Sequence, residues 1–107
     1  MAWLLRDDEV LASAEVVSGL RRLRALSGGA DGVVVLRPAR AAVTFGAGGP
    51  VDLVFCDAGM EVLEVLAAVP PGRLTRPRPR ARVVIGGEAG FADRFRLQPG
   101  DHLELRE

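Results

Sequence analysis

One short apolar segment limits the fold of this chain more than any other feature. Val51–Cys56 is apolar at every position except Asp52, and a continuous apolar run of this length indicates a strand that is buried on both faces. The glycine-rich stretch Gly46–Pro50 precedes the segment and Asp57–Gly59 follows it, and both are typical of loops and turns. The segment is therefore predicted to be a short central strand with other strands beside it.

The rest of the chain supplies such strands. A charged break at Asp7–Glu9 between two apolar runs favours an N-terminal hairpin. Met60–Val69 fits the period of a strand or of a helix, and its short link to the central segment favours a second hairpin. Further strands are expected at Trp3–Arg6, Val10–Val17, Val33–Leu36, Ala41–Phe45, Val83–Ile85 and His102–Arg106.

Two helices are also expected. Apolar residues recur at spacings of three and four through Ser18–Ser27, where Ser18 can cap a helix and Gly28 can end it. A shorter helix is expected over Ala89–Leu97. The predicted class is α+β: a strand-rich, mostly antiparallel barrel-like or sandwich domain with one early helix and one short late helix.

Composition sets the class of protein. The 107 residues are 49% hydrophobic and 26% charged, which is typical of one globular domain spanning residues 1–107. All 14 basic residues are arginine and 14 residues are acidic, so the net charge is zero. Polyanion binding rests on excess positive charge, and nucleic acid is therefore not the expected partner. Zero net charge also leaves little repulsion between copies, so weak homo-oligomerisation is an alternative.

The expected location is the cytoplasm. No stretch approaches the ~20 apolar residues of a membrane span, and the apolar start of the chain is interrupted at once by Arg6 and Asp7. Cys56 is the single cysteine, so no disulfide can form within the chain, and a lone thiol fits a reducing compartment.

Several short stretches match one known family in order and spacing. These stretches are Trp3-Leu4-Leu5, Thr44-Phe45-Gly46, Pro50 to Asp57, Pro71-Gly72-Arg73-Leu74, Glu88-Ala89-Gly90 and Gln98-Pro99-Gly100-Asp101. Together they resemble the pattern of the small bacterial and archaeal family known as domain of unknown function 192, over nearly the whole chain. The resemblance implies a compact, strand-rich α+β domain with little helix and no established activity.

The sequence departs from that family pattern at polar positions. Val43 stands where members typically carry a histidine or a similar group, Ala47–Gly49 where they carry methionine and often a basic residue, and Ile85-Gly86 where they carry a Leu-Glu pair. Asp52 is the polar residue of the pattern that is retained. The resemblance therefore implies a degenerate member that keeps the scaffold.

Asp52 and Thr44 are the candidate ligand-binding residues. A carboxylate at the mouth of a central strand could act as a general base or a ligand in a small ligand-binding or hydrolase-like site. The alternative is that Asp52 accepts N–H groups from the backbone of the Gly46–Pro50 loop. Because no partner group for catalysis is visible, the structural role is favoured.

Other polar residues suggest no catalytic, metal or cofactor site. Cys56 and His102 are the only residues of their types and could form a nucleophilic pair, but Cys56 is expected in the core and His102 on the outer face of the last strand. One histidine and one cysteine do not complete a zinc site. Gly46–Gly49 and Gly86–Gly90 match no phosphate-binding motif and are expected to be turns with positive φ.

An arginine ridge lies in the connector before Val83. It consists of Arg76, Arg78, Arg80 and Arg82. These residues alternate with Pro77, Pro79 and Ala81, and an extended chain places alternate side chains on one face. A solvated ridge that protects a sheet edge is favoured, ahead of a site for an acidic protein partner or for RNA or another anion.

The sequence thus predicts a non-enzymatic accessory or protein-interaction domain with an unidentified protein partner. A ligand site around Asp52 and anion or RNA binding at Arg76–Arg82 are the alternatives.

Overall fold

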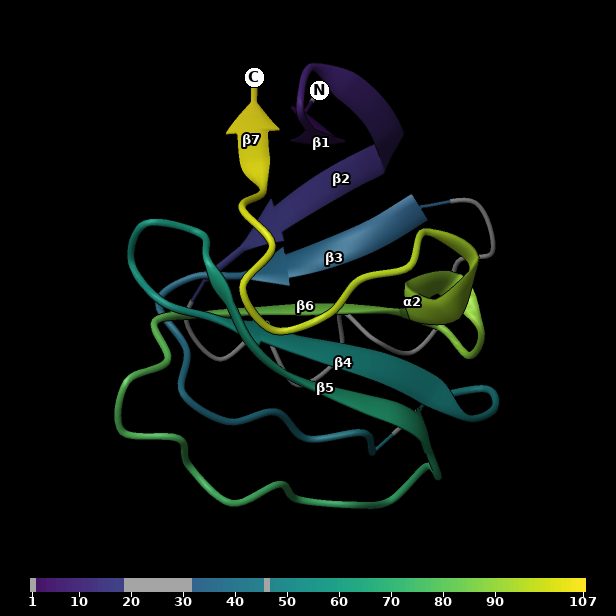
Figure 1. The fold of residues 1–107 in the computed structure, drawn as a ribbon. Helices are drawn as coiled ribbons and strands as arrows, with labels where there is room; N and C mark the ends of the chain where they lie inside the picture. Colours follow the sequence, from purple (N-terminus) through teal and green to yellow (C-terminus); the bar gives the residue numbers. More distant parts are fainter. Residues whose placement is uncertain (1, 19–31, 46) are drawn as a thin grey trace.

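Seven strands and one short helix make up the described chain. The computed structural model describes residues 2–18, 32–45 and 47–107 (Figure 1). Its elements are β1 (Ala2–Arg6), β2 (Glu9–Val17), β3 (Gly32–Leu36), β4 (Val51–Cys56), β5 (Val62–Val69), β6 (Val83–Glu88), α2 (Phe91–Arg94) and β7 (Glu104–Arg106). The strands form one sheet in the order β5-β4-β6-β3-β2-β1-β7.

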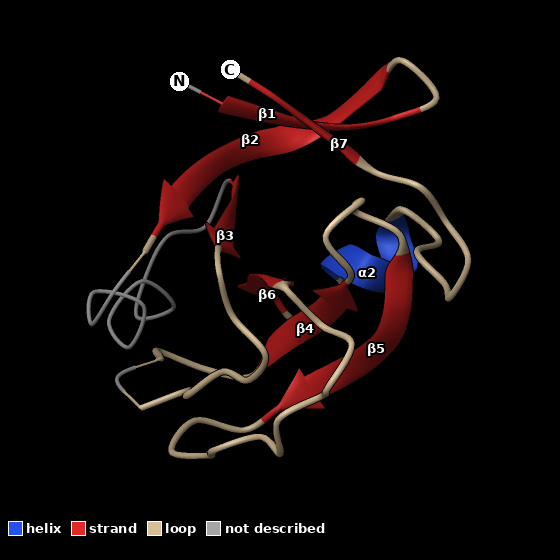
Figure 2. Cartoon of the chain, turned by 90° about the vertical axis from the view of Figure 1, so that its left-hand side faces the viewer, coloured by secondary structure: helices blue, strands red, loops and turns tan. Residues whose placement is uncertain are grey.

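This sheet is mixed and open. Five of its six strand pairings are antiparallel and only β2 with β3 is parallel, so the mostly antiparallel prediction is confirmed. The prediction of a barrel-like or sandwich domain is corrected to a single curved sheet, whose end strands are β5 and β7 (Figure 2). They do not close it, because in the described chain the two edges share only an isolated bridge between Glu61 and His102.

The helices differ most from expectation. The early helix predicted at 18–27 falls almost entirely outside the described residues. The late helix covers only Phe91–Arg94 rather than Ala89–Leu97, because left-handed residues flank it: Gly90 has φ 100° and Arg96 has φ 55°. Among the described residues, no helix has the length and apolar character needed to cross a bilayer.

Both expected hairpins are present. Asp7 and Asp8 have φ values of 52° and 67° between β1 and β2, which are the positive angles of a two-residue hairpin turn. In the second hairpin, Asp57 Oδ1 accepts hydrogen bonds from the N–H groups of Gly59 and Glu61 at 2.9 and 3.0 Å. The ambiguous Met60–Val69 segment is therefore a strand, β5, which pairs along β4.

β4 is the central strand that its apolar run predicts. It pairs with β5 on one side and β6 on the other, and all of its residues are buried. Val54 and Cys56 face a core that includes α2. Leu53 and Phe55 face a second core. Both faces of this strand are therefore covered.

The second core is covered by two irregular segments, residues 39–45 and 73–82, which we call the arm. The arm is the pair of loops that run below β4 and β5 in Figure 1. Its segments are joined by backbone hydrogen bonds from Thr44 N to Arg73 O, Thr75 N to Ala42 O and Arg78 N to Arg40 O at 2.8–3.0 Å. The strand expected over Ala41–Phe45 is reduced to one bridge, between Val43 and Leu74.

The glycines before α2 also differ from expectation. Gly86 and Gly87 lie inside β6 and not in a turn, and of the Gly86–Gly90 stretch only Gly90 has a positive φ. Gly87 is instead required by a close approach. A Cβ atom there would lie 2.7 Å from Cδ1 of the buried Phe91 ring, which holds α2 against the sheet.

Replacing Gly87 with alanine is expected to lower the free energy of unfolding by about 1–3 kcal/mol, because the new methyl group displaces the Phe91 ring. Urea unfolding measures the change. Gly48→Ala is the matched control, since nothing lies within 4 Å of a Cβ at Gly48, and its effect should stay within about 0.5 kcal/mol. Equal stability of the two variants would show that α2 does not pack on β6 as described.

Candidate functional site

Asp52 is buried and fully engaged by backbone N–H groups. Its Oδ1 accepts a hydrogen bond from Ala68 N at 2.8 Å, and its Oδ2 accepts from Gly90 N and Ala92 N at 2.9 and 3.1 Å. The side chain is 2% exposed. It shares a strand face with Val54 and Cys56, because alternate residues of a strand point the same way. The carboxylate therefore faces α2.

The partners of Asp52 correct the expected loop cap. The Gly46–Pro50 loop donates none of these three bonds. The register of β4 with β5 shifts between Val51 and Leu53, and Ala68 opposite this shift has φ 52°. A residue in such a bulge loses its place in the ladder, and Asp52 accepts the N–H group that Ala68 would otherwise leave unpaired.

Thr44 is also occupied by the backbone. Its hydroxyl donates to Pro70 O at 2.7 Å and accepts from Arg73 N at 2.8 Å. The residue is 0% exposed, and its carbonyl oxygen accepts from Gly72 N at 3.1 Å. Thr44 thus fixes the turn that leads into the second segment of the arm. Neither candidate ligand-binding residue presents a polar atom without a protein partner.

Cys56 and His102 do not form a nucleophilic arrangement. Cys56 is completely buried, and burial, helped by the charge of Asp57, raises the pKa of its thiol to about 12. The His102 side chain is 70% exposed, and its Nε2 lies 3.5 Å from Oε1 of Glu61. Within the described residues, no three histidine, cysteine or acidic side chains are grouped as metal ligands.

The four arginines do not form one uniform ridge. Arg78 is turned back against the protein: its Nε and Nη2 donate to the two carboxylate oxygens of Glu64 at 3.0 and 2.9 Å. Its guanidinium also lies 4.5 Å from the centre of the Phe55 ring. A turn, in which Ala81 N donates to Arg78 O at 3.0 Å, interrupts the extended chain that the alternation required.

Charge is distributed unevenly along this segment. The hydrogen bond from Arg78 lowers the pKa of the Glu64 carboxyl and raises that of the guanidinium. Arg82 Nη1 donates to the carbonyl oxygens of Pro79 and Ala81 at 2.9 and 2.8 Å. Arg76 and Arg80 are exposed. Two of the four arginines therefore stabilise the arm itself.

The arm carries a feature that the sequence analysis missed. Phe45 is 61% exposed and Leu74 is 72% exposed, the highest values among the exposed large hydrophobic residues of the described chain. Leu74 is bridged to Val43, and the Phe45 ring lies beside Gly72. Burial alternates along the segment, with Ala42 and Thr44 inside. The available signal was an apolar Leu74 within an arginine-rich connector.

A groove adjoins these exposed residues. It has a volume of about 290 Å³ and is lined by residues 39–43, Leu36 and Pro77. Most of this lining is apolar, and Arg40 is its charged residue. Val43 belongs both to the groove and to the backbone bridge with Leu74, so the groove lies next to the part of the arm that carries Leu74.

Removing the Asp52 carboxylate is expected to be costly. Asp52→Ala leaves three buried N–H groups without an acceptor and should lower the free energy of unfolding on the order of 3 kcal/mol. Asp52→Asn should lose less stability than Asp52→Ala, because the amide keeps one oxygen as an acceptor. Part of the loss remains, because the new NH₂ group faces an N–H donor. Thermal or urea unfolding measures both. Full stability of Asp52→Ala would contradict the structural role and revive the ligand site.

The Cys56 thiol is expected to react slowly in the native protein. Because the reactive form is the thiolate and the pKa is raised to about 12, the thiol stays protonated well above neutral pH. In the urea-unfolded chain the thiol has an ordinary pKa of about 8.5, so raising the pH from about 7 to about 9 should strongly speed its labelling. The same change of pH should alter the labelling rate of the native protein little. Stoichiometric labelling of native protein within seconds at neutral pH would contradict a buried thiol.

The comparisons with known proteins show the fold and no family. No family model matches the sequence, and no curated protein matches it. The resemblance to the domain of unknown function 192 family is therefore not confirmed by a family model.

Solved bacterial structures are similar to this chain. A protein of unknown function from Novosphingobium aromaticivorans DSM 12444 aligns with a TM-score of 0.74 and 15% identity, over 96% of this chain and 82% of that chain. A protein described as a putative transcription regulator from Sinorhizobium meliloti 1021 aligns with a TM-score of 0.76 and 18% identity, over 96% and 90%. A putative exported protein from Burkholderia pseudomallei K96243 aligns with a TM-score of 0.56 and 15% identity, over 97% of this chain but 24% of that one. At these identities the likeness establishes a shared fold.

Proposed function

We propose that this chain is a non-enzymatic protein-interaction domain whose binding surface is the outer face of the arm. The observation that carries the proposal is the exposure of Phe45 and Leu74, at 61% and 72%, on a segment whose backbone is tied down. Exposed apolar side chains that are grouped on an ordered surface mark interaction sites more often than scattered ones do.

The arm is ordered before any partner binds. Thr44 holds the turn at Pro70 and Arg73 through its hydroxyl, and Arg78 fastens the second segment to Glu64. A surface that is already in its binding conformation loses less conformational entropy on association. Phe45 and Leu74 can therefore act as anchors at low entropic cost.

The chemistry of the surface favours an acidic partner segment with an apolar side chain. Arg40 and Arg76 are exposed on the same arm, and arginine with aromatic residues is enriched at protein interfaces. The groove of about 290 Å³ beside Val43 offers a place for one apolar side chain of the partner. The zero net charge of the whole chain favours such a local contact over general binding of RNA.

An accessory role fits the remaining observations. The polar atoms of Asp52 and Thr44 are used within the fold, which favours a degenerate member of the domain of unknown function 192 family over a hydrolase. One structural neighbour is described as a putative transcription regulator, and regulation through protein contacts is the corresponding role proposed here. The cytoplasm is the proposed location, because its reducing conditions suit the unpaired Cys56.

Selection from a library of displayed peptides tests this function. Wild-type protein should enrich peptides in which an apolar residue is flanked by aspartate or glutamate. The double variant Phe45→Ala with Leu74→Ala should bind the selected peptides at least about tenfold more weakly, since two anchors of roughly 1 kcal/mol or more are removed. Fluorescence anisotropy measures the affinity, and Val10→Ala is the matched control because Val10 is 54% exposed outside the arm.

Two results would contradict the proposal. Equal peptide affinity in the double variant and the wild type would exclude the arm as the surface. Submicromolar binding of single-stranded RNA by the wild type would favour the anion-binding alternative. The affinity should then fall with salt with a log–log slope near −2 to −4, and binding should be lost when Arg76, Arg80 and Arg82 are all replaced by serine.

A further inference from the structure

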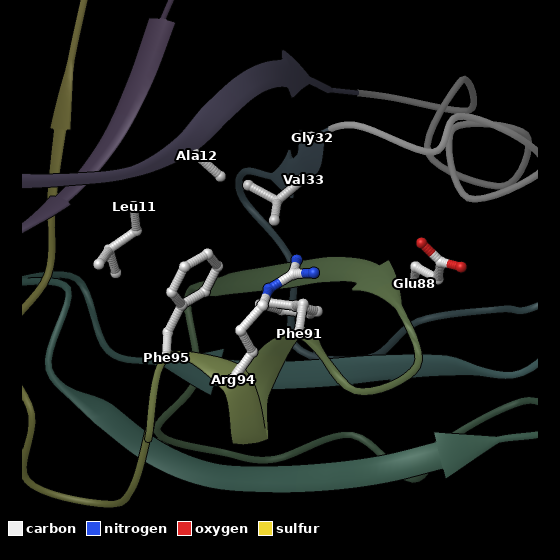
Figure 3. Close-up of a pocket in the computed structure, with 8 residues that line it drawn as sticks. All are labelled: Leu11, Ala12, Gly32, Val33, Glu88, Phe91, Arg94 and Phe95. Carbon is white, nitrogen blue, oxygen red and sulfur yellow. The ribbon is translucent and has the colours of Figure 1, made fainter.

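A second cavity lies on the other side of the central strands, between α2 and the strands β2 and β3. It has a volume of about 180 Å³. Figure 3 shows its lining residues converging from β2, β3, the end of β6 and α2. The cavity follows from the short helix, because four residues span only ~6 Å and cannot cover the concave face of a seven-stranded sheet.

Apolar side chains form the inner part of this cavity, whereas most of its exposed surface is polar. Leu11 comes from β2, Val33 from β3 and Phe91 from α2, and all three are buried core residues. Phe95 stands beside them as a partly buried ring. By volume, a cavity of roughly 150 Å³ accommodates a benzene-sized group. The space therefore fits one aromatic ring or a short branched alkyl chain.

One exposed cation lines the cavity without a carboxylate partner among the described residues. The guanidinium of Arg94 projects among the lining side chains in Figure 3, and its central carbon lies 5.0 Å from the centre of the Phe95 ring. Within the described residues, none of the ion pairs includes Arg94. Glu88 also lines the cavity, but it stands apart from Arg94 at one end.

We propose that this cavity binds a small monocarboxylate with an apolar body, such as an aromatic or branched-chain acid. The apolar body occupies the space between Leu11, Val33 and Phe91, and the carboxylate accepts paired hydrogen bonds from Arg94, whose planar guanidinium matches it. Stacking on Phe95 holds the guanidinium in place. A ligand amine would lack a partner at Arg94, and the carboxylate of Glu88 disfavours ligands with a second negative charge.

Benzoate is the probe, and benzamide is its uncharged counterpart of equal size. Titration of ¹⁵N-labelled protein should shift the amide signals of Leu11, Ala12 and Val33, with a dissociation constant on the order of 1 mM for a ligand of this size. Arg94→Ala should weaken benzoate binding about tenfold or more, because a charged hydrogen-bonded pair is lost. Benzamide should bind the wild type and Arg94→Ala with similarly low affinity.

Three further variants locate the site. Ala12→Leu fills the cavity and should abolish the shifts, whereas Arg80→Ala, which removes an exposed arginine outside the cavity, should leave the affinity unchanged. Glu88→Gln should tighten benzoate binding, because it removes a repelling charge. The proposal is overturned if benzoate causes no shifts at these residues up to about ten times the expected constant. Equal binding of benzoate and benzamide, or unchanged affinity in Arg94→Ala, would also overturn it, as would weaker binding in Glu88→Gln.

Discussion

The carboxylate of Asp52 is the contact on which the arrangement of the other elements depends. It accepts N–H groups from the bulge of β5 at Ala68 and from the start of α2 at Gly90 and Ala92. Each of these groups lacks a partner in its own element, because a bulge breaks the ladder and the first turn of a helix has no preceding carbonyl groups. One buried side chain therefore fixes the edge of the sheet and the helix together. Its charge is tolerated inside the core because hydrogen bonds replace its water.

The same constraint explains where the molecule keeps exposed apolar groups. β4 is buried on both faces, so one face requires α2 and the other requires the arm. Neither cover is a regular element of normal length, because α2 has four residues and the arm has only one bridge. Short covers leave gaps. The gap beside α2 is the cavity at Arg94, and the outer side of the arm exposes Phe45 and Leu74.

Local patterns predicted most of the strands, and long-range contacts decided the site. The run Val51–Cys56 predicts a central strand because a continuous apolar run has to be buried on both sides, and the break at Asp7–Glu9 predicts the first hairpin because a charged interruption between two apolar runs favours local reversal. The donors to Asp52 lie 16, 38 and 40 residues away along the chain, so no spacing rule could reveal them. The arginine alternation misled because the side chain of Arg78 pairs with Glu64 and lies over the Phe55 ring instead of projecting into solvent. The open sheet likewise depends on how far its two edges curl, which no local pattern encodes.

The arm and the cavity at Arg94 lie on opposite faces of the central strands, and this separation bears on how the two proposed sites act. Communication between sites requires an element with two alternative packings that both ligands bias. The strands between them, β4 and β6, contribute Leu53, Val54, Phe55, Val84 and Ile85, all of them fully buried. Close-packed strands of this kind have little room for a second arrangement. The fold therefore favours two independent sites whose binding free energies add, and a coupled response would have to arise at the edges of the sheet, where Glu61 and His102, which precede β5 and β7, form a single bridge.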